Sequence, residues 1–515
     1  MKTLGELIRW RAGQHPGRVA LEYEGRQTTY AELDRRASQV AAALIAAGAQ
    51  PGDRVCVLDQ GHDYFFETIF GIAKAGAVFT PVNWRLAPPE MASLIEDAQA
   101  PVLLVGPAFA GAIESVEAGL RTVRTIVCFA DSHPRWQPYP TWRDTAPADD
   151  PQRDAGEHDT VWQLYTSGTT GRPKGAEITN RNLFTVLANG IISGLKVSPG
   201  DCGLVCLPLY HIGGAGYAVS LLYGGMTLVI ANVFDPDGIL RLIETRHIKQ
   251  SFLVPTMINF LLQMPSAATA DLSSLETIIY GASPIPTDVL ERAIQRLGCS
   301  FIQAYGLTET TGAICYLSAD DHVPGHERLR SAGRPALGIE IRIMDSKGRI
   351  CGPGEVGEVV VRGDAVMKGY WNQPEATREA IVDGWFHTGD AGYFDADGYL
   401  FIHDRVKDMI VSGAENVYPA EVESALFDHP AVLDAAVVGV PDAHWGEAVK
   451  AVVQLRPGHT ATEDELIEHC KARIARYKCP KSVEFADVLP RNPTGKLLRR
   501  ELRERYWKDR DRRVN

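Results

Sequence analysis

Short apolar runs alternate with helical periods through the first 400 residues of the chain. A run of four or five apolar residues is typical of a strand that is buried on both faces. Such runs occupy residues 55–58, 102–105, 126–129 and 277–280. Between them lie amphipathic helical stretches, and the one that ends at Gly48 opens with a capping box formed by Thr29 and Glu32. This alternation predicts a layered α/β architecture.

The segment 202–234 contains no Asp, Glu, Lys or Arg and is long enough to span a bilayer. A proline at position 208 and five glycines divide it into pieces that are each too short to cross. We therefore expect a buried strand over 204–207, a core helix over about 215–223 and a second buried strand over 227–231. The chain is predicted to have no membrane-spanning helix.

The pattern changes at 403–408, where HDRVKD places five ionisable side chains within six residues. A compact alternation follows it: helical at 420–428, extended at 432–440 and 448–455, and helical at 463–475. This predicts a large layered α/β domain over 1–404 and a small α+β domain over 405–515. The Pro-, Asp- and Trp-rich stretch 136–156 is predicted to be a surface connection.

Composition narrows the function classes. The chain has 515 residues, of which 45% are hydrophobic and 23% charged, as in ordinary globular proteins. A net charge of −12 argues against nucleic acid or an anionic membrane as the main partner. The nine cysteines are odd in number and lack Cys-x-x-Cys spacing, which indicates a reduced cytoplasmic location without a structural metal. The first 16 residues carry too many charges for a signal peptide.

The segment YTSGTTGRPKG at 165–175 has the residue types of a phosphate-binding loop. Seven of its eleven residues are Thr, Ser or Gly, so hydroxyl donors alternate with backbone that can approach an anion closely. It is not a Walker loop, since no Gly-Lys-Ser/Thr follows the glycines, and a polar surface turn is the alternative. The predicted phosphate-binding residues are Thr166, Ser167, Gly168, Thr169, Thr170, Gly171 and Lys174.

A second candidate segment, QAYGLTET at 303–310, follows an apolar run. Tyr305 can stack on a base, Thr308 can bond a phosphate, and Glu309 can bind Mg²⁺ through oxygen. A polar strand end is the alternative. By contrast, the glycines of CGPGEVGE at 351–358 match a dinucleotide-binding pattern only formally, because a proline interrupts them and a strand follows.

These segments, in this order, resemble the AMP-forming acyl-CoA synthetase family, which includes luciferases and peptide-synthetase adenylation domains. The resemblance extends from AGAVFTPVN at 75–83 to RNPTGKLLRR at 491–500. It implies that Asp390 in GWFHTGD and Arg405 in HDRVKD hold the ribose of ATP. It also implies that Lys407 is the hinge of a mobile C-terminal domain and that Lys496 contacts the reacting carboxylate and the α-phosphate.

Three further segments gain a role from the same resemblance. PLYHIGG at 208–214 puts His211 at the entry of the acyl pocket, where the alternative is a core histidine. YGASPIP at 280–286 borders the adenine and the acyl group, and HWGEAVKA at 444–451 borders the coenzyme A tunnel. The residues predicted to contact adenine or CoA are Gly281, Ala282, Ser283, Gln303, Ala304, Tyr305, Gly306, Trp445 and Gly446. Arg85 and Tyr477 with Lys478 are candidates for the nucleotide end of CoA.

The resemblance implies that a carboxylate and MgATP form acyl-AMP and pyrophosphate, and that CoA then displaces AMP. The predicted walls of the acid site, 209–217 and 280–284, contain no charged residue, which favours an apolar monocarboxylate. A medium- or long-chain fatty acid is the first expectation, and an aryl or cyclic acid the second. An adenylating enzyme with another acceptor and an inactive nucleotide sensor remain alternatives, and the oligomeric state, monomer or homodimer, stays open.

Overall fold

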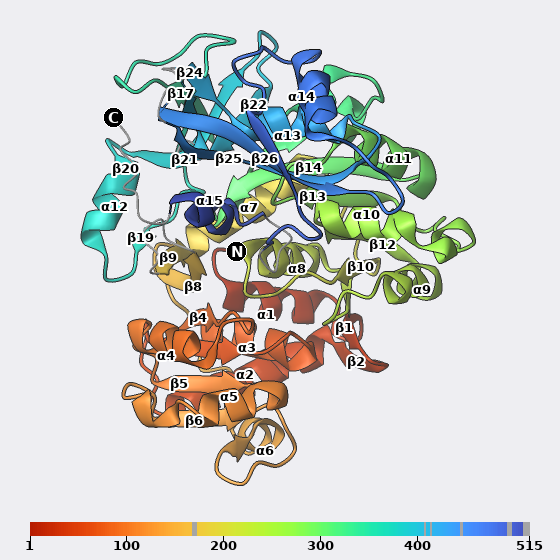
Figure 1. Cartoon of the computed structure of the whole chain (residues 1–515). Helices are drawn as coiled ribbons and strands as arrows, with labels where there is room; N and C mark the ends of the chain where they lie inside the picture. The colour runs from red at the N-terminus through yellow and green to blue at the C-terminus, as the bar shows by residue number, and fades with distance from the viewer. Residues whose placement is uncertain (167–172, 406–407, 413–414, 443–445, 492–496, 508–515) are drawn as a thin grey trace.

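The computed structural model describes residues 1–166, 173–405, 408–412, 415–442, 446–491 and 497–507. It contains two large mixed sheets, a smaller sheet above them and a separate C-terminal body (Figure 1). The first sheet has the order β16 (Arg334–Pro335), β15 (Gly312–Leu317), β14 (Ser300–Leu307), β13 (Thr277–Gly281), β12 (Ile248–Leu253), β10 (Cys202–Val205), β11 (Thr227–Ile230), β1 (Val19–Tyr23), β2 (Arg26–Thr29).

The other two sheets of the large domain lie on either side of the first. The second sheet has the order β19 (Gly369–Tyr370), β9 (Lys174–Thr179), β8 (Thr160–Thr166), β4 (Val78–Pro81), β3 (Arg54–Leu58), β5 (Val102–Val105), β6 (Thr125–Cys128), β7 (Gln137–Pro138). The third sheet has the order β17 (Glu340–Met344), β18 (Gly357–Arg362), β21 (Trp385–Phe394), β20 (Ile381–Val382), with β22 (Leu400–Arg405) paired to β21.

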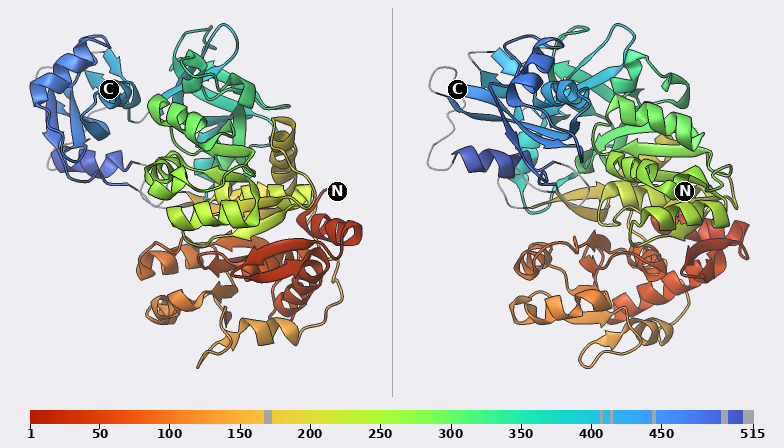
Figure 2. Two further views of the ribbon diagram at one scale, coloured as in Figure 1. Left: turned by 90° about the vertical axis from the view of Figure 1, so that its right-hand side faces the viewer. Right: turned by 45° about the vertical axis from the view of Figure 1, so that its right-hand side comes forward.

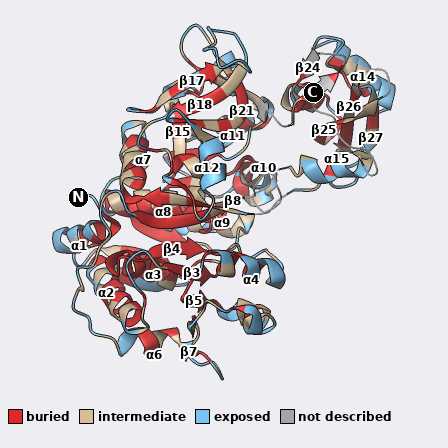
Figure 3. Cartoon of the chain, turned by 90° about the vertical axis from the view of Figure 1, so that its left-hand side faces the viewer, coloured by how far each residue is buried: buried red, intermediate tan, exposed pale blue. Residues whose placement is uncertain are grey.

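Helices cover these sheets and fill the space between them (Figure 3). They are α1 (Leu4–Gln14), α2 (Tyr30–Ala46), α3 (Asp63–Lys74), α4 (Pro88–Asp97), α5 (Ala110–Glu114), α6 (Tyr139–Asp144), α7 (Asn180–Ile192), α8 (Ile212–Gly224), α9 (Pro236–Arg246), α10 (Pro255–Gln263), α11 (Thr287–Leu297) and α12 (Pro374–Ala380). Buried side chains of α2, α3 and α8 share one apolar core with strands of both large sheets, as with Leu33, Phe66 and Leu221.

The C-terminal body stands apart from the large domain (Figure 2). Its sheet has the order β24 (Glu415–Val417), β23 (Ile410–Ser412), β26 (Gly446–Leu455), β25 (Val432–Asp442), with β27 (Ser482–Phe485) paired to β26. Its helices are α13 (Pro419–Phe427), α14 (Glu463–Lys471) and α15 (Arg499–Trp507). It has an apolar core of its own, built around Val422, Val437 and Val452. The architecture is the predicted one, a large α/β domain with a small α+β domain.

The uncharged segment 202–234 folds as predicted, into β10, α8 and β11, with a left-handed Gly225 ending the helix. The Thr29–Glu32 capping box is also present. Among the described residues, no helix combines the length and the apolar character needed to cross a membrane.

The prediction of a plain surface connection over 136–156 is wrong. This stretch contains β7 and α6, and Tyr139 of α6 is fully buried. The aromatic rings pack into the large domain, where Tyr139 contacts Phe129 at a centroid distance of 4.8 Å. The proline and aspartate content concealed a helix whose packing partners come from elsewhere in the chain.

Candidate active site

Two hydrogen bonds join the three sheets of the large domain at the predicted site. Thr166 ends β8 in the second sheet, and its Oγ1 donates to Glu309 Oε1 at 3.3 Å. Glu309 follows β14 of the first sheet, in a 3₁₀ turn over Thr308–Thr310. Tyr305 of β14 donates from Oη to Asp390 Oδ2 of β21, at 2.7 Å. Residues from three separate sequence motifs therefore lie together.

The predicted phosphate loop connects β8 to β9, and most of it, residues 167–172, lies outside the described residues. Its two flanks are described. Thr166 and Lys174 are cross-strand partners where the antiparallel β8–β9 ladder ends. Because a hairpin brings its two ends together, the predicted loop begins beside Glu309 and returns there at Lys174.

Tyr370 is a site residue that the sequence analysis missed. Its Oη donates a second hydrogen bond to Glu309 Oε1, at 3.0 Å, and the Nζ atom of Lys174 lies 4.9 Å from its ring centroid. Two backbone contacts fix its segment. Met367 donates from N to the carbonyl oxygen of Glu309 at 2.8 Å, and β19 pairs with β9. Tyr370 is separated from Glu309 by 61 residues, so no local motif links the two.

The Glu309 carboxylate suits Mg²⁺ better than a metal that needs a protein cage. No group of three or more His, Cys, Asp or Glu side chains could hold a metal within the part of the chain that the structure describes. Mg²⁺ usually keeps several waters and binds to one or two carboxylates together with substrate phosphates. Glu309 offers one such carboxylate beside the flanks of the predicted phosphate loop, and both of the hydroxyl groups described above bond the same oxygen, Oε1.

The predicted adenine segments meet at the carboxyl ends of two parallel strands. Gly281 of β13 and Ala304 of β14 are cross-strand partners, and a Cβ atom on Gly281 would collide with the carbonyl oxygen of Ala304. Ala282, which follows, is exposed with a φ of 68°, in the left-handed region. In open α/β sheets, ligands bind outside the carboxyl ends of the strands. The structure thus brings together Gly281, Ala282, Ser283, Gln303, Ala304, Tyr305 and Gly306.

The predicted ribose pair lies on neighbouring strands. Asp390 is buried, and its backbone N donates to Thr388 Oγ1 at 3.0 Å. Asp390 of β21 is the cross-strand partner of Arg405 of β22. This register agrees with a joint role for the two residues, while the description of Arg405 extends only to its backbone.

His211 precedes α8 as its N-cap residue. Burial, and to a smaller extent the positive charge of Arg85, lower the pKa of His211 to about 4. The imidazole is therefore neutral at physiological pH. Its ring centroid lies 4.3 Å from that of Tyr210, in a tilted contact. The predicted entry of the acyl pocket is thus formed by an uncharged, aromatic segment.

An apolar pocket of about 90 Å³ lies behind His211, between α7, α8 and strands β12 to β15. Among the residues that the structure describes, the lining includes no Asp, Glu, Lys, Arg or His. Segment 209–217 supplies Ile212, Gly213, Gly216 and Tyr217 to the wall, as predicted. The prediction that segment 280–284 forms a wall is not supported, since none of its residues is among the described lining residues. Tyr280 is buried with its Oη 2.9 Å from His322 Nε2. The remaining wall comes from α7 and from strands β12 to β15, and the sequence analysis did not identify the parts contributed by α7 and β15.

The residues predicted for CoA and for domain movement are only partly described. Gly446 begins β26 and pairs with Ser412 and Asp442. Lys478 forms an ion pair with Glu421 at 2.7 Å, and Tyr477 is exposed. Lys407, Trp445 and Lys496 lie outside the described residues, as do Ser167, Gly168, Thr169, Thr170 and Gly171.

Comparison with known proteins decides the family. Residues 8–371 match the model of the AMP-binding enzyme family, and residues 421–496 match that of the AMP-binding enzyme C-terminal domain. The chain belongs to the AMP-binding enzyme family. It is an AMP-forming acid–thiol ligase of the acyl-CoA synthetase superfamily.

Relatives of this AMP-binding enzyme differ in their acids. This chain is 40% identical to a fatty acid–[acyl-carrier-protein] ligase, ScoC, from Streptomyces coeruleorubidus, over 100% of this chain and 98% of the relative. It is 41% identical to a feruloyl-CoA synthase from an Amycolatopsis species, over 96% of this chain and 97% of the relative. A solved structure of the anthranilate CoA ligase AuaEII with anthranoyl-AMP matches with a TM-score of 0.91, at 27% identity, covering 98% of this chain and 97% of that one.

Proposed function

We propose that this enzyme is an ATP-dependent acid–CoA ligase that works through an acyl-AMP intermediate. Its substrate is a monocarboxylic acid with no charged group other than the carboxylate. The observation that carries the proposal is the apolar pocket, whose described lining residues carry no charged side chain. The pocket lies against strand β14, which leads to Tyr305 and Glu309. A second carboxylate or an amino group on the acid would need a charged partner in such a site.

In the first half-reaction, a carboxylate oxygen of the acid attacks the α-phosphorus of ATP. The bond from that phosphorus to the bridging oxygen of the β-phosphate breaks, and pyrophosphate leaves. Asp390 and Arg405 are proposed to hold the ribose, and Thr166, Lys174 and the residues between them the phosphates. Mg²⁺, when bound at Glu309, would offset negative charge on the phosphates. Lys496 is proposed to stabilise charge that develops in the transition state.

In the second half-reaction, the thiol sulfur of CoA attacks the acyl carbon of the adenylate. The bond from that carbon to the AMP oxygen breaks, AMP leaves with the electron pair, and the thiol proton passes to solvent. His211 is a weak proton acceptor because its pKa is lowered to about 4, which is consistent with a positioning rather than an acid–base role.

The pocket volume narrows the class of acid. An apolar protein cavity of roughly 150 Å³ accommodates benzene, whereas this pocket measures about 90 Å³. A compact aryl or cyclic acid therefore needs a smaller rearrangement than a long alkyl chain. This favours the aryl acid over the medium- or long-chain fatty acid that the sequence analysis ranked first.

Measuring AMP release and thioester formation tests the proposal. The panel contains acetate, octanoate, benzoate, cinnamate and phenylalanine, each with CoA, with a phosphopantetheine-bearing carrier protein, or with no acceptor. We expect CoA-dependent thioester formation, fastest with cinnamate or benzoate. If a thioester forms only with the carrier protein, the carrier protein replaces CoA as the proposed acceptor. A preference for acetate or phenylalanine would contradict the proposed pocket, and a maximum at octanoate would restore the fatty acid.

A further inference from the structure

One face of α8 forms a wall of the apolar pocket. Gly213, Gly216, Tyr217 and Ser220 all line it, at the spacing that places residues on the same side of a helix. The two glycines present no side chain to this space, and a Cβ atom on Gly213 would be in van der Waals contact with Phe252, at 3.6 Å. Tyr217 is therefore the largest side chain that α8 presents to this space.

The hydroxyl group of Tyr217 is buried. Tyr217 is only 7% exposed, and its Oη has no hydrogen-bond partner among the described residues. Buried hydroxyl groups are nearly always hydrogen-bonded in native proteins, because an unsatisfied one is costly. Burial also raises the pKa of Tyr217 well above its usual value, so the group stays a neutral O–H donor.

Packing explains the ring of Tyr217 but leaves its hydroxyl unexplained. The ring makes an edge-to-face contact with Phe252 at a centroid distance of 6.0 Å. Phenylalanine would make the same contact without burying a polar atom. Burying the oxygen atom thus has a cost that none of the described contacts offsets.

Three more residues with hydroxyl groups line the same pocket, Ser220, Thr311 and Tyr316, and the hydroxyl group of Thr311 is already bonded to the carbonyl oxygen of Ala365. Ser220 Oγ lies one turn along α8 and donates to the carbonyl oxygen of Gly216 at 2.8 Å, which leaves its oxygen able to accept. Tyr316 of β15 stands at the α7 side, where a Cβ atom on Gly190 would lie 3.7 Å from its Oη. A pocket with apolar walls, hydroxyl groups and no charged side chain suits a ligand that is apolar but carries a neutral polar group.

We propose that Tyr217 donates a hydrogen bond to a neutral oxygen substituent on the acid, so that the enzyme selects an oxygenated aryl acid over the unsubstituted one. The substituent is a phenolic hydroxyl or an aryl ether oxygen on the part of the acid remote from its carboxylate. This inference rests on the proposed function of the pocket as the acid site. A site built to hydrogen-bond a substrate oxygen rejects the analogue that lacks it, because its own polar group is then left unpaired.

The test compares kcat/KM for 4-hydroxycinnamate and 4-methoxycinnamate with that for cinnamate, in the wild-type enzyme and in Tyr217→Phe. We expect the wild type to prefer the oxygenated acids by about tenfold, the scale of one hydrogen bond. Tyr217→Phe should reduce this preference to within about twofold, because kcat/KM falls on the oxygenated acids relative to cinnamate. Tyr223→Phe is the matched control, since Tyr223 lies on the same helix but is not among the described lining residues, and it should leave the preference unchanged.

Two outcomes would overturn the inference: equal kcat/KM values for cinnamate and its oxygenated analogues in the wild type, or a preference that survives in Tyr217→Phe. Both leave thioester formation intact, so they are distinct from failure of the proposed function, in which no acid of the panel yields a CoA thioester. Pyrophosphate exchange with cinnamate checks that Tyr217→Phe is folded. Should that variant be inactive, the Tyr217→Met enzyme replaces it, and retention of the preference there would count against the inference.

Discussion

Glu309 receives hydrogen bonds from hydroxyl groups that come from distant parts of the chain. Thr166 lies 143 residues before it and Tyr370 lies 61 residues after it. Bonds to an ionised carboxylate are stronger than those between neutral groups, so the pair fixes the orientation of the carboxylate. The ring of Tyr370 also faces the Lys174 ammonium, in a cation–π contact. One side chain thereby orients a proposed metal ligand and a proposed phosphate ligand.

Tyr370→Phe should separate these two contacts, because it keeps the ring and removes the donor. We expect the Mg²⁺ concentration for half-maximal pyrophosphate exchange to rise and the adenylation rate to fall by about tenfold, the scale of one hydrogen bond to a charged group. Acid preference should not change. In a Glu309→Gln background the same substitution should add little, since coupled residues are not additive. An unchanged Mg²⁺ requirement in Tyr370→Phe would show that its hydroxyl does not act through Glu309.

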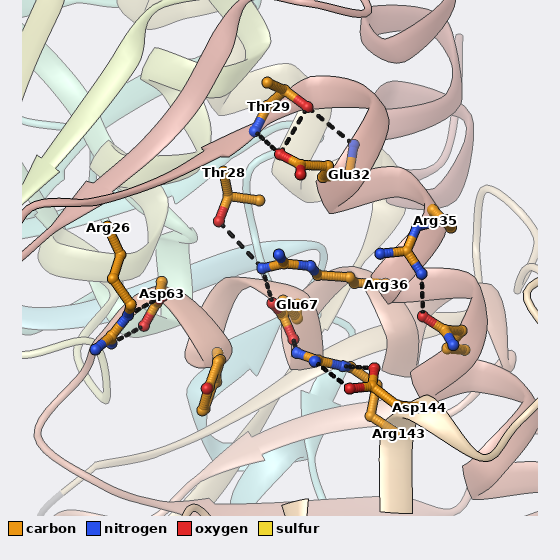
Figure 4. A network of polar contacts seen from close by, with 12 residues as sticks. Arg26, Thr28, Thr29, Glu32, Arg35, Arg36, Asp63, Glu67, Arg143 and Asp144 are labelled. Carbon is orange, nitrogen blue, oxygen red and sulfur yellow. Dashed lines mark hydrogen bonds and ion pairs between the residues drawn. The ribbon is translucent and has the colours of Figure 1, made fainter. Parts of the chain in front are cut away.

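At the scale of elements, a buried carboxylate ties three helices of the large domain together (Figure 4). Glu67 of α3 has a fully buried side chain. It pairs with Arg36 of α2 at 3.0 Å and with Arg143 of α6 at 2.7 Å, and Tyr139 of α6 donates to it at 2.9 Å. Arg143 also forms two hydrogen bonds with Asp144. Helix α6 is thus held by charge as well as by its aromatic rings.

Arg143→Met should destabilise the large domain, because it leaves part of the Glu67 charge buried and unpaired. We expect the free energy of its unfolding transition in urea to fall by about 3 kcal/mol. Arg35→Met is the matched control: Arg35 lies on the exposed side of α2, bonded to Gln39, and its loss should cost less than about 0.5 kcal/mol. Equal effects of the two substitutions would mean that the Glu67 pair contributes nothing specific.

Elements with strong local signals could be predicted from sequence. The sequence predicts three consecutive elements, β10, α8 and β11, because Pro208 and the glycines divide an otherwise uniform apolar run. Helix α6 could not, since the residues that bury it lie in α2 and α3. In the site, four residues could be predicted because each lies in a recognisable sequence motif: Thr166, Tyr305, Glu309 and Asp390. Tyr370 and the α7 wall of the pocket gain their roles only from contacts made across the fold.

At the scale of the whole molecule, the proposed chemistry needs the C-terminal body to act differently in each half-reaction. That body has a core of its own, separate from the cores of the large domain, so it can move as a unit. Residues 406 and 407 lie between Arg405 of β22 and Asp408, where the description of the C-terminal body resumes. Hinge movement of this kind concentrates changes of φ and ψ in a few residues.

Lys407→Pro should therefore separate the two half-reactions. Proline fixes φ near −65°, so only one arrangement of the two domains would stay accessible. We expect acid-dependent pyrophosphate exchange to be largely kept, while thioester formation from supplied acyl-AMP and CoA fails.

Lys496→Ala should show the converse: pyrophosphate exchange falls by on the order of a hundredfold, the scale of one lost electrostatic stabiliser, and thioester formation continues. Because the two variants affect opposite steps, general misfolding cannot produce both results. Intact thioester formation in Lys407→Pro would place the pivot elsewhere, and equal damage to both steps in Lys496→Ala would remove that lysine from the adenylation site.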